Sequence, residues 1–446
     1  MARLIESLAT TEALAEVFSD TSIVQAMLDF EVALARAEAR AGIVPKSATD
    51  RIAAAAHASE FDVPALSRGM FRAGTLSIPL VKALTEKVKA EDVDAAGWVH
   101  WGATSQDVAD TALVLLLKRT GTIISRDLKR LEKALSALSG KHKKTVMLGR
   151  TLMQAAPPVT FGLKVAGWLG AVKRSSRHAE SAFEEAQILQ FGGASGTLAF
   201  LREKGSVVAH GLAKELGLSC PEAPWHTHRD RLANLVCSCG VLTGSLGKMA
   251  RDISLLMQTE VAEAAEPGGE GRGGSSTMPH KRNPIACALT LAAAERVPGL
   301  VAGFLSAMVQ EHERAVGGWQ SEWPTIASIV QATGTAAASM AEVAEGLSVD
   351  PARMRENIAR TKGQMFAERT IMLLAAELGR DAAHKLLENA LQKAAAQKKS
   401  LSTVLAELPE FSSRLSRAEL DKLEIPELYL GSAEVFREAL VKKEGK

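Results

Sequence analysis

The residues best suited to chemistry follow a glycine-rich run in the segment from 267 to 284. Five glycines occur among residues 267–274. The polar residues that follow include Ser275, Ser276, Lys281 and Asn283. Glycines leave backbone N–H groups uncovered, so an anion can approach closely, and Asn283 before Pro284 is typical of a helix start, whose free amides favour negative charge. The segment predicts a loop that binds an anionic substrate.

Two nucleotide-binding alternatives fit the glycines but not their context. The order Gly269-x-Gly271-x-x-Gly274 has the spacing of a dinucleotide fingerprint, which requires a preceding strand. Residues 246–262 instead place apolar side chains at helical spacing. A phosphate-binding P-loop needs a glycine, four residues and then Gly-Lys-Ser/Thr, and this order does not occur. A flexible linker before an ordinary helix start fits the residues alone equally well.

A second polar segment precedes a long helical pattern that begins near Ser105. Thr104 is typical of an N-cap, with Asp107 three residues further on. Hydroxyls and free N–H groups at a helix start also bind carboxylates well. Capping and carboxylate binding are both consistent with this segment, and one does not exclude the other.

Residues 274–284 read Gly-Ser-Ser-Thr-Met-Pro-His-Lys-Arg-Asn-Pro and resemble the hallmark of the fumarase/aspartase superfamily. Residues 100–107 follow a second superfamily pattern, His-x-Gly-x-Thr-Ser-x-Asp. Residues 149–154, Gly-Arg-Thr-Leu-Met-Gln, are similar to a third, Gly-Arg-Thr-His-x-Gln. The resemblance covers essentially the whole chain.

Two positions separate the chain from the nucleotide and amino-acid lyases of this superfamily. Leu152 stands where adenylosuccinate and argininosuccinate lyases carry a histidine, and a leucine cannot transfer a proton. Ala288 stands where many relatives have a glutamate. The 3-carboxy-cis,cis-muconate cycloisomerases share both departures, although Thr75 differs from their Ala-Gly-Asn pattern. Four longer stretches also resemble this branch: residues 190–196, 224–230, 252–260 and 310–314.

The resemblance implies an enzyme that converts 3-carboxy-cis,cis-muconate to 4-carboxymuconolactone, a step of bacterial protocatechuate breakdown. It implies Ser275 as the proton-transfer residue, with Lys281 and Asn283 stabilising a dianionic intermediate. Further residues are implied at the substrate site: His100, Thr104, Ser105, Thr151, Gln154, Arg229, Ser276, Met278 and Arg314. Metal-ligand spacing such as H-E-x-x-H does not occur, and the resemblance implies no metal or other cofactor.

Two other functions stay open. The first is a C–N or related β-eliminating lyase that acts on a succinyl-type substrate and releases fumarate. Such an enzyme would share the fold and the loop that carries Ser275. The second is a non-catalytic structural tetramer, against which the intact set of Ser275, Lys281 and Asn283 argues.

Composition narrows the class of partner and the compartment. The net charge is +2, with both signs interspersed along the 446 residues, so we expect no nucleic acid and no membrane partner. Four cysteines without C-x-x-C spacing fit a reducing cytoplasm. No run is expected to reach the length of a membrane span.

The elements that position these residues are expected to be almost entirely helical. Aromatic residues make up only 4% of the chain, and strand-like alternation is scarce. Helical patterns cover residues 8–41, 47–57, 105–138, 157–189, 228–265, 284–310 and 325–345. A polar segment at 91–97 and the shorter helical patterns after 350 predict three domains: an N-terminal helical domain (1–95), a central helix bundle (96–347) and a C-terminal helical domain (348–446).

The resemblance implies the same all-α, three-domain subunit. It further implies a central bundle of five long helices that joins three other copies in a twenty-helix homotetramer core. Each active site would then be built from three subunits and would bind a small polycarboxylate.

Overall fold

The computed structural model describes residues 4–269, 273–274, 277–278, 281–414 and 416–442. The chain forms two compact units, and each unit is built from three separate segments of the sequence. Unit 1 comprises residues 1–130, 174–247 and 288–340, and unit 2 comprises residues 131–173, 248–287 and 341–446. The three predicted domains, with boundaries near residues 95 and 347, are instead continuous stretches of the sequence. The three-domain division therefore stays a prediction.

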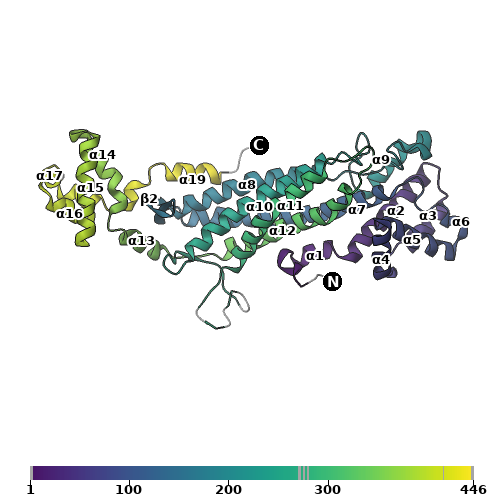
Figure 1. Cartoon of the computed structure of the whole chain (residues 1–446), viewed down its shortest axis with the longest axis horizontal. Helices are drawn as coiled ribbons and strands as arrows, with labels where there is room; N and C mark the ends of the chain where they lie inside the picture. The colour runs from purple at the N-terminus through teal and green to yellow at the C-terminus, as the bar shows by residue number, and fades with distance from the viewer. Residues whose placement is uncertain (1–3, 270–272, 275–276, 279–280, 415, 443–446) are drawn as a thin grey trace. The chain divides into compact units, whose positions relative to one another are not determined.

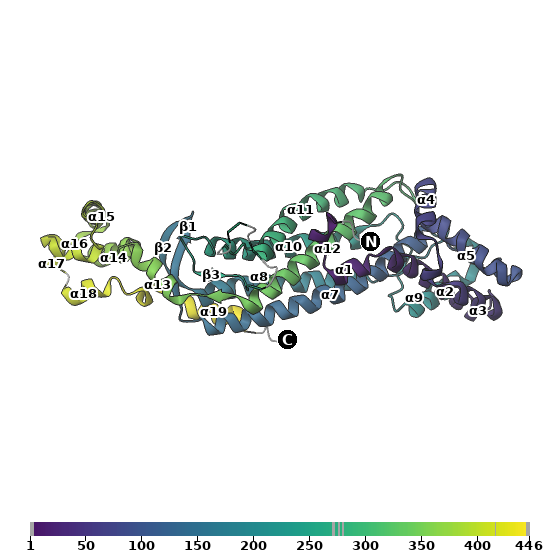
Figure 2. The same cartoon turned by 90° about the horizontal axis from the view of Figure 1, so that it is seen from below.

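The predicted all-α fold is confirmed. Five long helices contribute a segment to each unit: α7 (Ser105–Lys141), α8 (Phe161–Glu185), α10 (Asp230–Leu256), α11 (Ile285–Ala307) and α12 (Gly318–Gly346). Within each unit these segments run side by side in both views (Figures 1 and 2). Ile124, Leu128 and Leu135 of α7 are at most 1% exposed, because their spacing places them on one face of the helix.

Unit 1 adds the N-terminal helices to its part of the bundle. They are α1 (Glu12–Val17), α2 (Asp20–Arg40), α3 (Lys46–Ala55), α4 (Val63–Ala73), α5 (Ser77–Glu91), α6 (Val93–Ala96) and α9 (Gly205–Leu216). The helix predicted over residues 8–41 is interrupted, because the Ser19 side chain accepts from the Ser22 backbone and caps a new helix. The polar segment at 91–97 contains a short helix, α6, which Asp92 caps in the same way.

Unit 2 contains the strands that the sequence did not reveal. Strands β1 (Val146–Thr151) and β2 (Gln154–Thr160) form an antiparallel hairpin, and β3 (Ala264–Ala265) pairs with β4 (Ser348–Val349). The helix predicted over residues 157–189 is therefore wrong at its start. Pro157 and Pro158 keep the chain extended, and α8 begins only after Thr160, whose side chain accepts from the Leu163 backbone.

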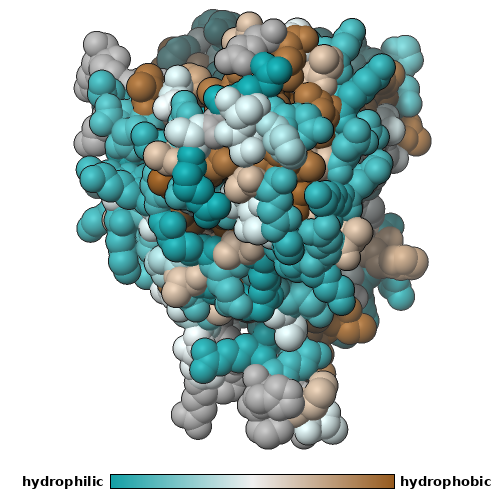
Figure 3. All heavy atoms as spheres, turned by 90° about the vertical axis from the view of Figure 1, so that its left-hand side faces the viewer, coloured by the Kyte–Doolittle hydropathy of each residue, from teal (hydrophilic) through white to brown (hydrophobic). Residues whose placement is uncertain are grey.

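The remaining helices of unit 2 are short. They are α13 (Pro351–Arg360), α14 (Ala367–Leu378), α15 (Arg380–Gln397), α16 (Leu401–Glu407), α17 (Pro409–Ser412), α18 (Arg417–Lys422) and α19 (Ala433–Val441). The turn expected at Pro426 is a 3-10 helix, Pro426–Tyr429. The face that carries α14 to α18 is mainly hydrophilic, with apolar side chains scattered among polar ones (Figure 3).

Helix α11 has a different surface character. Its mean hydropathy reaches 1.5, and only 28% of that apolar stretch is buried within the single chain. By length and composition alone the helix could cross a membrane, which corrects the expectation that no run reaches such a length, although core helices of soluble proteins also pass this test. Its exposed positions include small side chains, among them Ala288, Ala292, Gly299 and Ala302, and the charged Glu295 and Arg296.

Candidate active site

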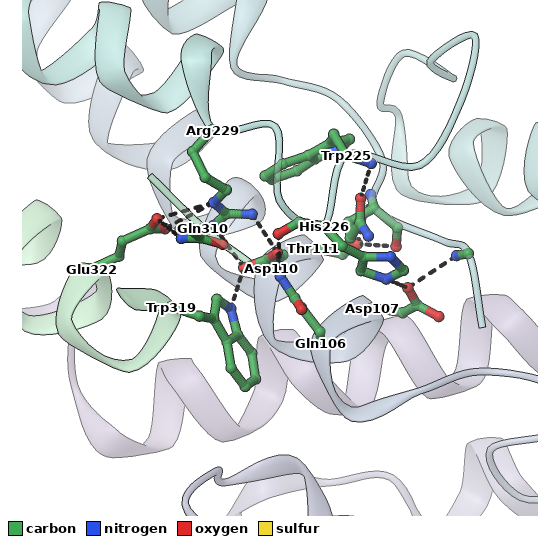
Figure 4. A network of polar contacts seen from close by, with 12 residues as sticks. Gln106, Asp107, Asp110, Thr111, Trp225, His226, Arg229, Gln310, Trp319 and Glu322 are labelled. Carbon is green, nitrogen blue, oxygen red and sulfur yellow. Dashed lines mark hydrogen bonds and ion pairs between the residues drawn. The ribbon is translucent and has the colours of Figure 1, made fainter. Parts of the chain in front are cut away.

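Asp107 organises the start of α7 and the glycine loop beside it. Its buried carboxylate accepts hydrogen bonds from the backbone N–H of Thr104 (3.0 Å), Gly192 (3.0 Å) and Gly193 (2.9 Å). His226 Nε2 lies 2.8 Å from the same carboxylate (Figure 4). The contact with Thr104 agrees with the capping interpretation of this segment. Because Asp107 uses its oxygens within the protein, it fixes the geometry of the site and is not free to react.

Thr104 and Ser105 stand half-buried at this helix start. Within the described part of the chain, no hydrogen bond to either hydroxyl is found, so both can serve an anionic ligand. The Ser105 carbonyl accepts from Ser77 Oγ (2.8 Å), and the Ser77 backbone donates to Thr75 Oγ1 (3.3 Å). Thr75 is only 4% exposed. This residue, which differs from the cycloisomerase pattern, therefore contacts the start of α7 indirectly, through Ser77.

His100 lines a cavity of about 390 Å³ between residues 99–103 and 193–200. Its backbone has a φ of 61°, a conformation that is uncommon outside glycine and often marks a functional site. Nδ1 of His100 donates to Oε1 of Glu31 at 2.7 Å. Burial lowers the pKa of His100, but the charge of Glu31 and this hydrogen bond outweigh burial and raise the pKa above its ordinary value. The cavity wall therefore favours an imidazolium ion.

Arg229, which is predicted to contact the substrate, lies in a buried network of charged side chains. Its guanidinium, 1% exposed, forms a bidentate pair with Asp110 (2.7 and 3.1 Å) and contacts Glu322 at 2.6 to 3.2 Å (Figure 4). The ring of Trp225 lies 4.7 Å from the guanidinium carbon. Trp319 Nε1 donates to Asp110 (2.9 Å). Two protein carboxylates thus neutralise Arg229, and its role in the chain is to hold α7, α12 and the segment before α10 together.

Arg314 contacts the same glycine loop as Asp107. Its Nη2 donates to the carbonyls of Gly193 (2.8 Å) and Ala194 (3.0 Å). These two residues also line the cavity beside His100. Arg314 therefore positions the cavity wall and brings a positive charge near it.

The β1–β2 hairpin of unit 2 presents the third predicted segment. Thr151 pairs with Gln154 across a two-residue turn, and Leu152 and Met153 at its tip have φ values of 48° and 66°. Two consecutive positive φ values define a type I′ turn, which normally selects asparagine, aspartate or glycine. Leu152 is 97% exposed and Met153 71%. An apolar pair kept in a strained, exposed turn points to a function for this tip.

The hairpin is anchored at its base. Arg150 forms a bidentate pair with the buried carboxylate of Glu263 (2.9 and 2.7 Å), which also accepts from Asn357 (2.8 Å). Gly149 is required beside it, because a Cβ there would lie 2.3 Å from the Pro157 carbonyl oxygen. The tip thus has a fixed base although its own side chains are exposed.

The glycine-rich loop is described in part. Ser275 and Ser276 lie outside the described residues. Lys281 is exposed, and Met278 is 42% exposed. The Asn283 backbone donates to the Gly273 carbonyl (2.8 Å), and Asn283 Nδ2 donates to that of Gly274 (3.4 Å). These contacts join Asn283 to the described residues Gly273 and Gly274.

The side chain that caps the start of α11 belongs to a residue, Glu266, that the sequence analysis did not single out. The carboxylate of Glu266, 6% exposed, accepts from the backbone N–H of Ala286 (3.1 Å) and Cys287 (2.7 Å). The expected Asn283 cap is therefore corrected: Glu266 is the side chain that satisfies these amides. Its negative charge compensates the positive end of the helix, so this helix start is not an open anion site.

The predicted residues thus fall into two groups. His100, Thr104, Ser105, Arg229 and Arg314 belong to unit 1, where Arg314 contacts the loop at 192–198 through Gly193 and Ala194. Unit 2 carries the others that the structure describes: Thr151, Gln154, Met278, Lys281 and Asn283.

Among the described residues, no three His, Cys, Asp or Glu side chains form a cluster that could hold a metal ion. Glu31 was also missed, although an acid within the apolar stripe of a helix is a signal visible in the sequence.

Comparison with known proteins assigns the family. A family model described as lyase matches residues 6–299, and one described as adenylosuccinate lyase C-terminus matches residues 363–440. The chain belongs to this lyase family, the fumarase/aspartase superfamily, as the motif at 274–284 predicted.

Two proteins of similar sequence and one solved structure show which members of the family this chain resembles. A 3-carboxy-cis,cis-muconate cycloisomerase from Bradyrhizobium diazoefficiens is 47% identical over 98% of this chain and 97% of the relative. The crystal structure of the 3-carboxy-cis,cis-muconate lactonizing enzyme from Pseudomonas putida matches with a TM-score of 0.93 at 47% identity, covering 99% of this chain and 98% of that one. A nitrosuccinate lyase from Streptomyces davaonensis is 42% identical over 93% of this chain and 89% of the relative.

Proposed function

We propose that this protein is a cycloisomerase that converts 3-carboxy-cis,cis-muconate to 4-carboxymuconolactone. The observation that carries the proposal is the hairpin tip, where Leu152 offers an exposed apolar side chain at the position of a proton donor in other lyases. Lactonisation needs no acid there, because the attacking group is an ionised carboxylate of the substrate. The full-length similarity to two such enzymes supports the same reaction.

In the proposed reaction one carboxylate oxygen of the substrate adds to a C=C bond. The electron pair moves onto the carbon next to a second carboxylate and forms an aci-carboxylate dianion, which then takes one proton at that carbon. We assign this proton to Ser275, with Lys281 and Asn283 stabilising the dianion. The helix start at Thr104 and Ser105 offers free hydroxyls for a substrate carboxylate.

The remaining predicted positions have supporting roles in this proposal. Thr151 and Gln154 flank the hairpin tip, and Ser276 and Met278 belong to the glycine-rich loop. Arg314 holds the cavity wall through Gly193. No step of the proposed reaction requires a metal or an organic cofactor.

We further propose a homotetramer whose active sites are shared between subunits. The outward stripe of small side chains on α11 supports this assembly, because an apolar helix that is largely uncovered within one chain gains by packing against another copy. The exposed Leu152 and Met153 support it as well, since contact with a second copy would bury them. A cytoplasmic location agrees with the four free cysteines.

A β-eliminating lyase is the second candidate, and the similarity to nitrosuccinate lyase favours it specifically. Elimination of nitrite expels a stable anion, so an apolar residue at position 152 would be tolerated there too. Cleavage of argininosuccinate or adenylosuccinate expels a poor nitrogen leaving group that Leu152 cannot protonate.

A direct comparison of substrates tests the proposal. The purified protein is incubated with 3-carboxy-cis,cis-muconate, and loss of diene absorbance is followed. Parallel reactions contain nitrosuccinate, argininosuccinate or adenylosuccinate, with fumarate release as the readout. We expect the highest kcat/KM for 3-carboxymuconate. A higher value for any succinyl compound would replace the cycloisomerase with a β-eliminating lyase.

A further inference from the structure

Helix α2 buries two acidic residues on one apolar stripe. Glu31 and Glu38 are seven residues apart and share a face with Val24 and Leu34. They are 2% and 0% exposed. Within the described chain, both oxygens of Glu38 and Oε2 of Glu31 have no hydrogen-bond partner. Burial of an unpaired carboxylate is strongly unfavourable, so this cluster must be neutralised by protons or by a counter-ion.

The two acids are neutralised in different ways. Burial, with a further contribution from Glu31, raises the pKa of Glu38 to about 9, so Glu38 is a neutral acid at neutral pH. Glu31 lies 2.7 Å from Nδ1 of His100, whose pKa it raises. The side chains of Glu31 and His100 are 1% and 19% exposed. A buried carboxylate needs a hydrogen-bond donor or a cation as its partner, and Nδ1–H of His100 is that partner for Oε1 of Glu31.

The contact with Glu31 determines what His100 can offer to a ligand. Because Nδ1 donates to Glu31, a neutral imidazole would present the lone pair of Nε2. A lone pair repels a carboxylate, whereas the imidazolium presents a second N–H. Residues 193–195 and 197–200 line the same cavity as His100. Only the doubly protonated ring therefore suits an anionic ligand in this cavity.

We propose that Glu31 is a positioning residue that keeps the imidazole of His100 doubly protonated, so that its Nε2–H binds a carboxylate of the substrate in this cavity. The proposal rests on the proposed function, because it takes the ligand to be a polycarboxylate. It adds to that function a residue outside the three family motifs. It also predicts that substrate binding depends on pH through His100.

Other charged groups near His100 do not replace Glu31. Asp107 on α7 also favours the charged ring, but its oxygens are occupied by three backbone amides and His226. Glu38 on α2 is protonated. Arg314 contacts the cavity wall and disfavours a second cation, yet it also attracts the ligand. Glu31 is the acid in direct contact with the ring, so its removal should have the larger effect.

The test measures binding of propane-1,2,3-tricarboxylate, which has three carboxylates and no C=C bond. Its affinity for the full-length protein is determined by calorimetry from about pH 5.5 to about pH 9. Glu31→Gln is compared with wild type and with Glu86→Gln, an exposed acid of α5. We expect wild type to lose affinity as the pH rises through the raised pKa of His100. Glu31→Gln should lose it at lower pH, with a difference on the order of tenfold near pH 8 that narrows as the pH falls.

Proton uptake gives a second readout that a purely structural role would not change. In buffers of different ionisation enthalpy, Glu31→Gln should take up more protons on binding near neutral pH than wild type, because its free His100 is neutral. Glu86→Gln should match wild type in both measurements. Parallel pH profiles for Glu31→Gln and wild type, or equal proton uptake, would overturn the proposal.

His100→Asn keeps the proposal testable if Glu31→Gln does not fold. Asparagine tolerates the positive φ at this position. Its binding should show none of the pH dependence assigned to His100, and retention of the wild-type profile would overturn the proposal. Turnover of 3-carboxymuconate is assayed on the same samples. A wild type that binds as expected without turnover contradicts the proposed function alone, whereas turnover with an unchanged Glu31→Gln profile contradicts this inference alone.

Discussion

Glu38 makes the stability of the protein depend on pH in a direction that can be calculated. Its carboxyl group is 0% exposed and has no hydrogen-bond partner within the described residues. The pKa is about 9 in the folded chain against an ordinary value of 4.5. A raised pKa means that the folded state holds the proton more tightly than the unfolded state. The stabilising effect is complete below the unfolded pKa and is lost as pH rises through the folded pKa.

The magnitude follows from the two pKa values. Each pKa unit corresponds to about 1.4 kcal/mol, so Glu38 lowers the free energy of unfolding by about 1 kcal/mol near pH 5 and by about 5 kcal/mol near pH 8. Glu38→Gln removes the titrating group and should remove this difference of about 4 kcal/mol. With an unfolding entropy of about 2.1 cal/mol/K per residue, the chain would gain about 4 °C in Tm near pH 8 relative to pH 5.

The assay is thermal unfolding at both pH values for wild type, Glu38→Gln and Glu86→Gln. The informative quantity is the Tm difference between variant and wild type, compared across pH, because packing changes in Glu38→Gln affect both pH values equally. Glu86 is exposed, so its variant should show a constant offset. If the advantage of Glu38→Gln is the same near pH 5 and near pH 8, Glu38 does not stay protonated in the folded chain and the reasoning fails.

Three further predictions concern the site. Ser275→Ala should lower kcat for 3-carboxymuconate by about 10²- to 10⁴-fold without changing the assembly seen in sedimentation; wild-type kcat would remove Ser275 from proton transfer. Leu152→His should lower kcat/KM for 3-carboxymuconate, because it replaces an apolar side chain at the exposed tip with a polar, ionisable one; an unchanged value would show that this side chain does not act on the substrate. Glu266→Ala should lower the unfolding free energy by about 1 to 2 kcal/mol, because the Ala286 and Cys287 amides lose their acceptor. A Tm equal to that of wild type would contradict this role of Glu266.

The long helices could be predicted because their apolar residues repeat at helical spacing. The start of α7 at Ser105 was found from its capping residues, and Leu128 and Leu135 are buried as their spacing indicates. Where local chemistry opposes the periodic pattern, the prediction failed. Pro157 and Pro158 shift the start of α8 to Phe161, and Ser19 divides the N-terminal helix.

The motif residues of the site could be recognised, but their partners could not. Arg229 contacts Asp110 and Glu322, which are 119 and 93 residues away in the chain. No local pattern indicates such pairings. The cap formed by Glu266 was missed for the same reason, since it lies 20 residues before the amide of Ala286 that it satisfies. Charge and burial of these residues become clear only once the tertiary contacts are known.

The turn that carries Leu152 can change in sequence with little effect on the folding of its own subunit. Leu152 and Met153 are largely exposed within their own chain, and the hairpin is anchored by the ion pair of Arg150 with Glu263. A replacement at the tip therefore removes few contacts within the subunit. A single codon change there can add or remove an ionisable group at a fixed point in space. Divergence between cyclising and eliminating enzymes can therefore proceed through the tip while the fold of the single subunit is kept. Laboratory evolution of new substrate preferences would do well to begin with these two positions.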